Sequence, residues 1–139
     1  MSRFVVDASV AAKWYFPEEH SEAALGVLHR DNELYAPDFL LAEVDAVAAK
    51  RLRRREITAG EAARVRAALR KVPLRYESFR VLLDPAFELS AATGSSLYDC
   101  LYLALALLRK APLLTADQRF YRALRRGPFA GQVKWVGEG

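Results

Sequence analysis

The sequence predicts an α/β protein in which helices flank a central parallel sheet of about five strands. Three observations lead to this fold class. Short apolar segments alternate with helix-length segments along the chain. The connections between the short segments are long enough for parallel crossovers. The first of them is apolar at consecutive positions, as is typical of strands that are buried on both faces.

In the first half of the chain, residues 4–6 are expected to form the central strand. A short helix over residues 10–16, a second helix from Pro17 to about residue 29 and a strand over residues 34–36 should follow. The next helix is expected to end near residue 54. Glu43 and Asp45 lie on opposite shoulders of its apolar stripe, and helical periodicity does not choose between them.

In the second half, Thr58 and Glu61 have the spacing of a capping box and predict a helix over residues 59–71. A strand over residues 74–78 and a helix from Asp84-Pro85 to Gly94 are expected next. The remaining expected elements are a helix over residues 97–108, a strand over 112–114, a helix to about 125 and an edge strand over 133–136. With no repeat or linker in the pattern, residues 1–139 are expected to form a single domain.

The composition is that of a globular protein, with 53% hydrophobic and 27% charged residues. We find no convincing membrane span and no signal-peptide pattern, so we expect a cytoplasmic protein without a membrane partner. Cys100 is a lone cysteine in an apolar helical run, which is typical of a small core residue. The net charge of +4 is compatible with a nucleic-acid partner.

The basic residues fall into two clusters, one near the end of the helix that carries Glu43 and one late in the chain. Such clusters are candidates for contacts with nucleic-acid phosphates, and they are equally compatible with solvated helix faces that complement the helix dipole. The residues that we expect to hold a nucleic acid are Arg53, Arg54, Arg55, Arg119 and Arg122.

Three acidic residues lie at positions that make them candidates for a functional site. Asp7 ends the first strand, although it could equally cap the helix that follows, and Asp117 ends a later strand in a similar way. Asp99 is the one charge in an otherwise apolar helix and needs a partner. That partner is an ion pair, a hydrogen bond near the helix start, where Ser95 or Ser96 is the expected cap, or a cation. If the three meet at one edge of the sheet, a cation must offset their repulsion. An oxygen-only site without histidine or thiolate favours Mg²⁺ or Mn²⁺.

Four motifs in order resemble the acidic motifs of PIN-domain ribonucleases, and their length and spacing are most similar to the VapC toxins of toxin–antitoxin pairs. The motifs are V-V-D-A-S, L-L-A-E-V, S-L-Y-D-C-L-Y-L-A-L-A and L-L-T-A-D-Q-R-F. The resemblance implies an α/β/α sandwich and a Mg²⁺- or Mn²⁺-dependent endoribonuclease that forms a homodimer and is inhibited by a small VapB-like antitoxin. It selects Glu43 over Asp45, so the implied catalytic and metal-binding residues are Asp7, Glu43, Asp99 and Asp117.

The resemblance also concerns residues beside these acids. Ser9 and Thr115 match small hydroxyl positions that would hydrogen-bond to the acids, although Ser9 could equally cap a helix. The family often has Asn three residues after the glutamate, and this chain has Ala46 there.

Two alternatives remain open: a catalytically silent PIN module that binds RNA or protein, and a PIN nuclease that acts outside a toxin system. A phosphoryl-aspartate phosphatase is disfavoured because Ser9 stands where its second Asp would be needed.

Overall fold

The computed structural model describes residues 2–138, and within them five parallel strands form one sheet in the order β3-β2-β1-β4-β5. The strands are β1 (Arg3–Val6), β2 (Glu33–Pro37), β3 (Arg75–Glu77), β4 (Leu113–Thr115) and β5 (Val133–Trp135). β1 lies at the centre and β5 at one edge, as predicted. In the register of the sheet, Val5 of β1 faces Tyr35 of β2 on one side and Leu113 of β4 on the other.

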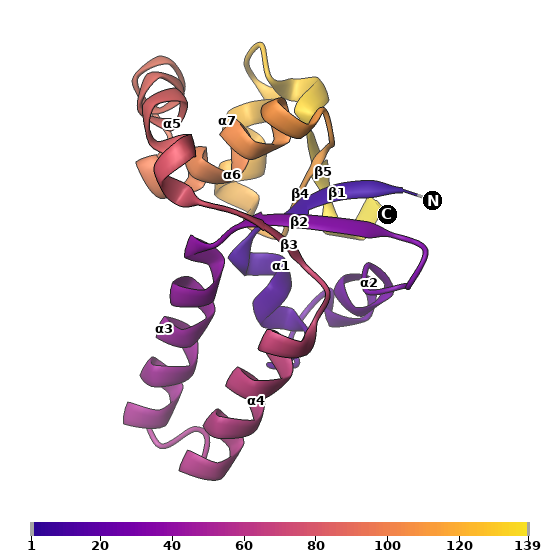
Figure 1. Ribbon diagram of the computed structural model, residues 1–139, viewed down its shortest axis with the longest axis vertical. Coiled ribbons are helices and arrows are strands. Elements are labelled where there is room, and N and C mark those ends of the chain that lie inside the picture. Colours follow the sequence, from indigo (N-terminus) through magenta and orange to yellow (C-terminus); the bar gives the residue numbers. More distant parts are fainter. Residues whose placement is uncertain (1, 139) are drawn as a thin grey trace.

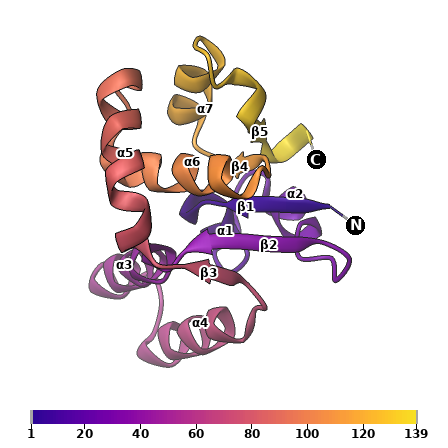
Figure 2. The same ribbon diagram turned by 45° about the horizontal axis from the view of Figure 1, so that its top comes forward.

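Helices cover both faces of this sheet, which confirms the predicted α/β/α sandwich (Figures 1 and 2). One face carries α1 (Ala8–Lys13), α2 (Ser21–Gly26), α3 (Phe39–Arg53) and α4 (Ala59–Lys71). The other face carries α5 (Phe79–Thr93), α6 (Leu97–Arg109) and α7 (Gln118–Arg125). Short 3₁₀ turns at Ala130–Gln132 and Val136–Glu138 flank β5.

Helix α6 lies against the sheet and supplies much of the core. Its residues from Cys100 to Ala106 are all buried, and the Cys100 side chain is fully inaccessible, as expected. The ends of α6 are different, because Tyr98 is 57% exposed and Leu108 is 53% exposed. A helix that is apolar on every face is expected to be buried, and α6 meets this expectation only in its middle.

Two helix starts were predicted wrongly from proline. Pro17 precedes α2 by four residues and does not open a helix. Helix α5 begins at Phe79 and contains Pro85 in its interior. Its start has a local cap, because the Ser78 Oγ accepts a hydrogen bond from the backbone N–H of Arg80 at 3.3 Å. The Asp38 side chain adds a tertiary contact by accepting from the backbone N–H of Phe79 at 2.9 Å. Ser78 was the available local signal, whereas the contact with Asp38, 41 residues away in sequence, leaves none.

Helices α3 and α4 form a hairpin that extends away from the sheet (Figure 1). Asp45 joins them, because its carboxylate lies 2.7 Å from the guanidinium of Arg70 and 3.2 Å from that of Arg66. The capping box of Thr58 and Glu61 at the start of α4 is present as predicted. Asp45 thus has a structural role in the hairpin.

Within residues 2–138, no single helix is both long and apolar enough to cross a membrane. Helices α5 and α6 meet that test by length and composition only as a pair, and they are bent by 113° at the break between them.

Candidate active site

Asp7 and Asp117 lie at the same edge of the sheet because they follow the adjacent parallel strands β1 and β4. Each also caps the helix behind it. The Asp7 Oδ1 accepts from the backbone N–H of Val10 at 3.2 Å, and the Asp117 Oδ1 accepts from that of Phe120 at 3.1 Å. Both expectations for Asp7 therefore hold: it caps α1, and it stands at the carboxyl end of the central strand, where open parallel sheets place their ligands.

Two hydroxyl groups connect these strand ends. The Ser9 Oγ donates to Asp7 at 2.5 Å and accepts from the backbone N–H of Ala116 at 2.8 Å. The Thr115 Oγ1 accepts from the backbone N–H of Asp117 at 3.1 Å and lies 3.4 Å from the Ser9 Oγ. Ser9 and Thr115 thus hold the loop after β4 against the start of α1, beside the Asp7 carboxylate.

Glu43 and Asp99 reach the site from helices. Glu43 lies on α3 and accepts a 2.5 Å hydrogen bond from the Tyr102 hydroxyl of α6. Asp99 lies in the first turn of α6, whose N-cap is Ser96. Within residues 2–138 Asp99 makes no ion pair, so the structure does not bear out the ion-pair explanation for this acid.

The carboxylates disturb one another. Burial raises the pKa of Asp7 to about 7, the charge of Asp99 adds to the rise, and hydrogen bonds from Ser9, Thr115 and Val10 oppose it. Burial and the Asp99 charge raise the pKa of Glu43. Burial and the Asp117 charge raise the pKa of Asp99. Asp99 therefore interacts electrostatically with each of the other three acids, and the excess negative charge favours a cation.

The type of donor atom fits a hard divalent cation, but the carboxylates do not form a closed cage. Among the residues described, no three acidic, histidine or cysteine side chains converge closely enough to hold a metal ion. Mg²⁺ commonly binds through one or two carboxylates and keeps several waters, so an open arrangement of oxygen ligands is compatible with it.

A pocket of about 310 Å³ opens beside Glu43, between α1 and α3. Lys13 and Arg51 contribute cations to its wall, and the Arg51 guanidinium lies 4.7 Å from the centre of the Phe16 ring. Arg51 is not among the arginines that we expected to contact RNA. Its position two helical turns after Glu43 on α3 was the available signal.

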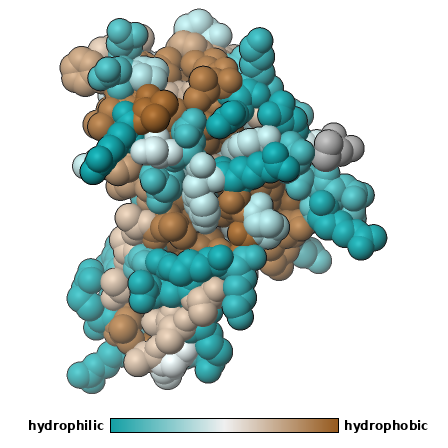
Figure 3. All heavy atoms as spheres, in the orientation of Figure 1, coloured by the Kyte–Doolittle hydropathy of each residue, from teal (hydrophilic) through white to brown (hydrophobic). Residues whose placement is uncertain are grey.

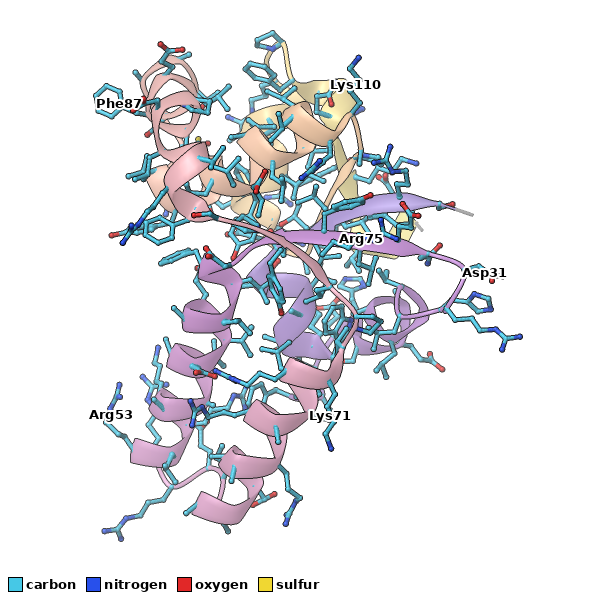
Figure 4. All side chains as sticks on the ribbon, viewed as in Figure 1. Asp31, Arg53, Lys71, Arg75, Phe87 and Lys110 are labelled. Atoms are coloured by element: carbon cyan, nitrogen blue, oxygen red, sulfur yellow. The ribbon has the colours of Figure 1, made fainter. Side chains whose placement is uncertain are left out.

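The arginines that were chosen lie elsewhere. Arg53 is at the outer end of α3, where its side chain points away from the sheet, and Arg54 and Arg55 follow in the turn to α4 (Figure 4). Arg119 and Arg122 are exposed on α7, the helix that Asp117 caps. Arg119 and Arg122 thus lie close to Asp117 in sequence. The three arginines at the end of α3 are separated from Glu43 by most of that helix.

A family model described as "PIN domain" matches residues 4–125. The chain belongs to the PIN-domain family. A curated relative, Ribonuclease VapC3 of Pyrobaculum aerophilum, is 34% identical over 119 residues, which cover 84% of this chain and 91% of that protein. The PIN match includes the strand-end acids, both helical acids and the two hydroxyl residues.

Solved structures share the PIN fold at low sequence identity. PAE2754 of Pyrobaculum aerophilum superposes with a TM-score of 0.73 at 18% identity, covering 99% of this chain and 85% of that one. VapC20 of Mycobacterium tuberculosis, described as a toxin that cleaves the sarcin–ricin loop, gives 0.66 at 18% identity and covers 86% and 94%. VapBC2 of Rickettsia felis, bound to a DNA fragment of its promoter, gives 0.64 at 14% identity and covers 96% and 98%.

Proposed function

We propose that this PIN protein is a Mg²⁺- or Mn²⁺-dependent endoribonuclease and the toxin of a VapBC-type toxin–antitoxin pair. The observation that carries the proposal is the placement of Asp7 and Asp117 at adjacent strand ends, with Asp99 interacting electrostatically with both of them and with Glu43. The similarity to Ribonuclease VapC3 over most of both chains supports the choice of RNA as substrate.

Each residue of the site would have its own role in the proposed reaction. Asp7, Glu43, Asp99 and Asp117 would surround the ion, one or two of them binding it directly and the others through its waters. The ion when bound would offset phosphate charge and favour deprotonation of an attacking water. Ser9 keeps one oxygen of Asp7 in place by its hydrogen bond, and Thr115 keeps the loop before Asp117 in place. Tyr102 orients Glu43 from the opposite helix. The carboxylates are thus positioned before substrate arrives.

An antitoxin partner and a cytoplasmic location belong to the same proposal. The likeness of this fold to VapBC2 of Rickettsia felis supports an antitoxin partner. A VapB-like tail that covers the acids would block both the cation and RNA.

We also propose a homodimer that forms through the face of α5 and α6. A groove of about 550 Å³ between these helices is lined largely by apolar side chains, among them Val81, Leu89 and Leu108. Val81 is 59% exposed, and apolar side chains gather over this part of the surface (upper left of Figure 3). A second copy can place the same helix pair against the groove in a two-fold arrangement. A monomeric mass for the parent in analytical ultracentrifugation would reject this proposal.

The experiment that tests the enzyme is incubation of the purified protein with total cellular RNA, with and without Mn²⁺, followed by mapping of new 5′ ends. The parent should cut only with Mn²⁺, and Asp7→Asn should not cut. Asp31→Asn is the matched control, because Asp31 is exposed in the loop before β2 (Figure 4) and should leave cleavage unchanged. Binding of RNA without any cut would favour the silent module.

The contribution of the proposed RNA-contacting arginines has a separate test. Phosphate contacts position RNA without reading its bases, so their loss should weaken binding for all sequences and leave the cleavage site unchanged. Each lost contact to single-stranded RNA should reduce the slope of log affinity against log salt by about 0.7. Arg119→Gln with Arg122→Gln, and Arg53→Gln with Arg54→Gln and Arg55→Gln, are compared on an Asp7→Asn background. An unchanged salt slope for either set would remove that set from the proposal.

A further inference from the structure

A stacked pair of aromatic rings comes from the two helices that carry Glu43 and Asp99, and one of the two rings is exposed. The rings of Phe39 and Tyr98 are stacked, with centroids 5.3 Å apart and planes 15° apart. Phe39 is the first residue of α3, and Tyr98 is in the first turn of α6. Phe39 is partly buried against the core, whereas Tyr98 is 57% exposed. The pair thus presents an aromatic surface to solvent on a supported ring.

Helical spacing places this pair one turn from the site. Phe39 and Glu43 are four residues apart on α3, and Tyr98 and Tyr102 are four residues apart on α6, so each couple shares a helix face. The two helices therefore meet twice: through the Phe39–Tyr98 stack and through the hydrogen bond from Tyr102 to Glu43. Asp99 directly follows Tyr98. An occupant of the exposed ring would lie beside the carboxylates.

We propose that Tyr98, supported by Phe39, stacks with a base of single-stranded RNA next to the phosphate that is cut. The inference rests on the proposed function and deepens it by naming a base subsite. Proteins bind unpaired bases by stacking them on aromatic side chains, and the side chain of Tyr98 is exposed to solvent. Because Phe39 holds the ring from behind, little side-chain freedom is lost when a base binds.

Burial of Tyr98 by a protein partner is the competing explanation, and the groove between α5 and α6 is where we place the second copy. The side chains that line this groove come from between Val81 and Leu108 in the sequence, and Tyr98 is not one of them. Tyr98 lies at the opposite end of α6 from Leu108, next to Asp99. Its neighbours in the fold are therefore the acids, and this position favours RNA over a second copy as the occupant.

The test measures the affinity of short single-stranded RNA oligonucleotides on an Asp7→Asn background, so that nothing is cut. Tyr98→Ala should weaken binding by about 10-fold or more, in keeping with the loss of one stacked base. Tyr98→Phe keeps the ring and should bind like the parent. Phe87→Ala is the matched control, since Phe87 is 69% exposed on α5 and points into solvent (Figure 4).

An abasic scan identifies the base. One nucleotide at a time is replaced by an abasic residue, and the effect of Tyr98→Ala is measured for each oligonucleotide. The effect should vanish for the position whose base stacks on Tyr98 and persist for the others. If Tyr98→Ala acts like Phe87→Ala, if its effect is the same at every abasic position, or if it instead lowers the mass of an assembly in ultracentrifugation, the inference is wrong.

Cleavage by the parent protein distinguishes failure of the base-subsite proposal from failure of the proposed function. Absence of Mn²⁺-dependent cleavage in the parent contradicts the ribonuclease itself. Cleavage by the parent together with full affinity in Tyr98→Ala contradicts only the base subsite.

Discussion

The Asp7 side chain caps α1, and it is also a buried carboxylate. Burial raises its pKa to about 7 in the folded protein, from the ordinary value of 3.8 that we assign to the unfolded chain. The unfolded chain therefore loses this proton first as the pH rises, and without metal the free energy of unfolding should fall between about pH 4 and pH 7. At about 1.4 kcal/mol per pKa unit, the loss amounts to a few kcal/mol.

We therefore expect Asp7→Asn to raise the midpoint of urea denaturation at pH 8 in metal-free buffer and to change it little at pH 4. Asn preserves a side-chain oxygen that can cap α1 while removing the charge. Asp45→Asn is the control with the opposite sign. Burial of Asp45 is outweighed by hydrogen bonds from Arg70 and Arg66, which lower its pKa, so its loss should destabilise the protein at pH 8 and matter less at low pH. Equal pH profiles for both variants would contradict this account.

Asp99 raises the pKa values of two neighbouring acids, and its own is raised by burial and by Asp117. Since the described residues give it no cationic partner, Asp99→Asn should relieve repulsion and raise the melting temperature in metal-free buffer, while it abolishes cleavage. Removing one member of a buried ion pair would instead destabilise by about 3 to 5 kcal/mol. A marked fall in melting temperature would thus favour a structural ion pair.

At the scale of elements, the turn between α5 and α6 decides where Tyr98 and Asp99 lie. Gly94 ends α5 with φ of +75°, a conformation that residues with a Cβ rarely adopt. Gly94→Ala should cost about 1 to 2 kcal/mol in unfolding free energy, measured by urea denaturation. Gly26→Ala is the matched control, because Gly26 is helical and open space surrounds it, so the substitution should stabilise by about 0.5 to 1 kcal/mol. A harmless Gly94→Ala would mean that the turn tolerates another conformation.

At the scale of the whole molecule, cation binding should stabilise the fold, because the acids come from separate elements that unfolding disperses. Mn²⁺ at about 100 times its dissociation constant should add roughly 2.7 kcal/mol to the unfolding free energy. Calorimetric scans should show a higher melting temperature with Mn²⁺ in the parent, reversal by a chelator, and no shift in Asp7→Asn. Equal shifts in parent and variant would place the ion elsewhere.

Local sequence determined much of the architecture. The apolar run at residues 4–6 predicted the central strand, and the Thr58–Glu61 spacing predicted α4 with its observed bounds. Such features depend on side chains within a turn or on burial of one short segment, so neighbouring residues carry the signal. Asp7, Asp99 and Asp117 could be selected for the same reason, since charges at strand ends and within an apolar helix stand out in sequence. Glu43 was chosen over Asp45 only by the resemblance to PIN-domain ribonucleases.

Contacts between distant segments were decided only by the tertiary structure. Examples are the hydrogen bond from the Phe79 N–H to Asp38 and the hydrogen bond from Tyr102 that orients Glu43. A third is the stacking of Phe39 on Tyr98. The same holds for the contrast between Arg51, which lines the pocket beside Glu43, and Arg53, which points away from the sheet. Periodicity reports which face of a helix a residue occupies, but the neighbour that covers that face depends on how helices pack across the sheet, and no local pattern encodes that packing.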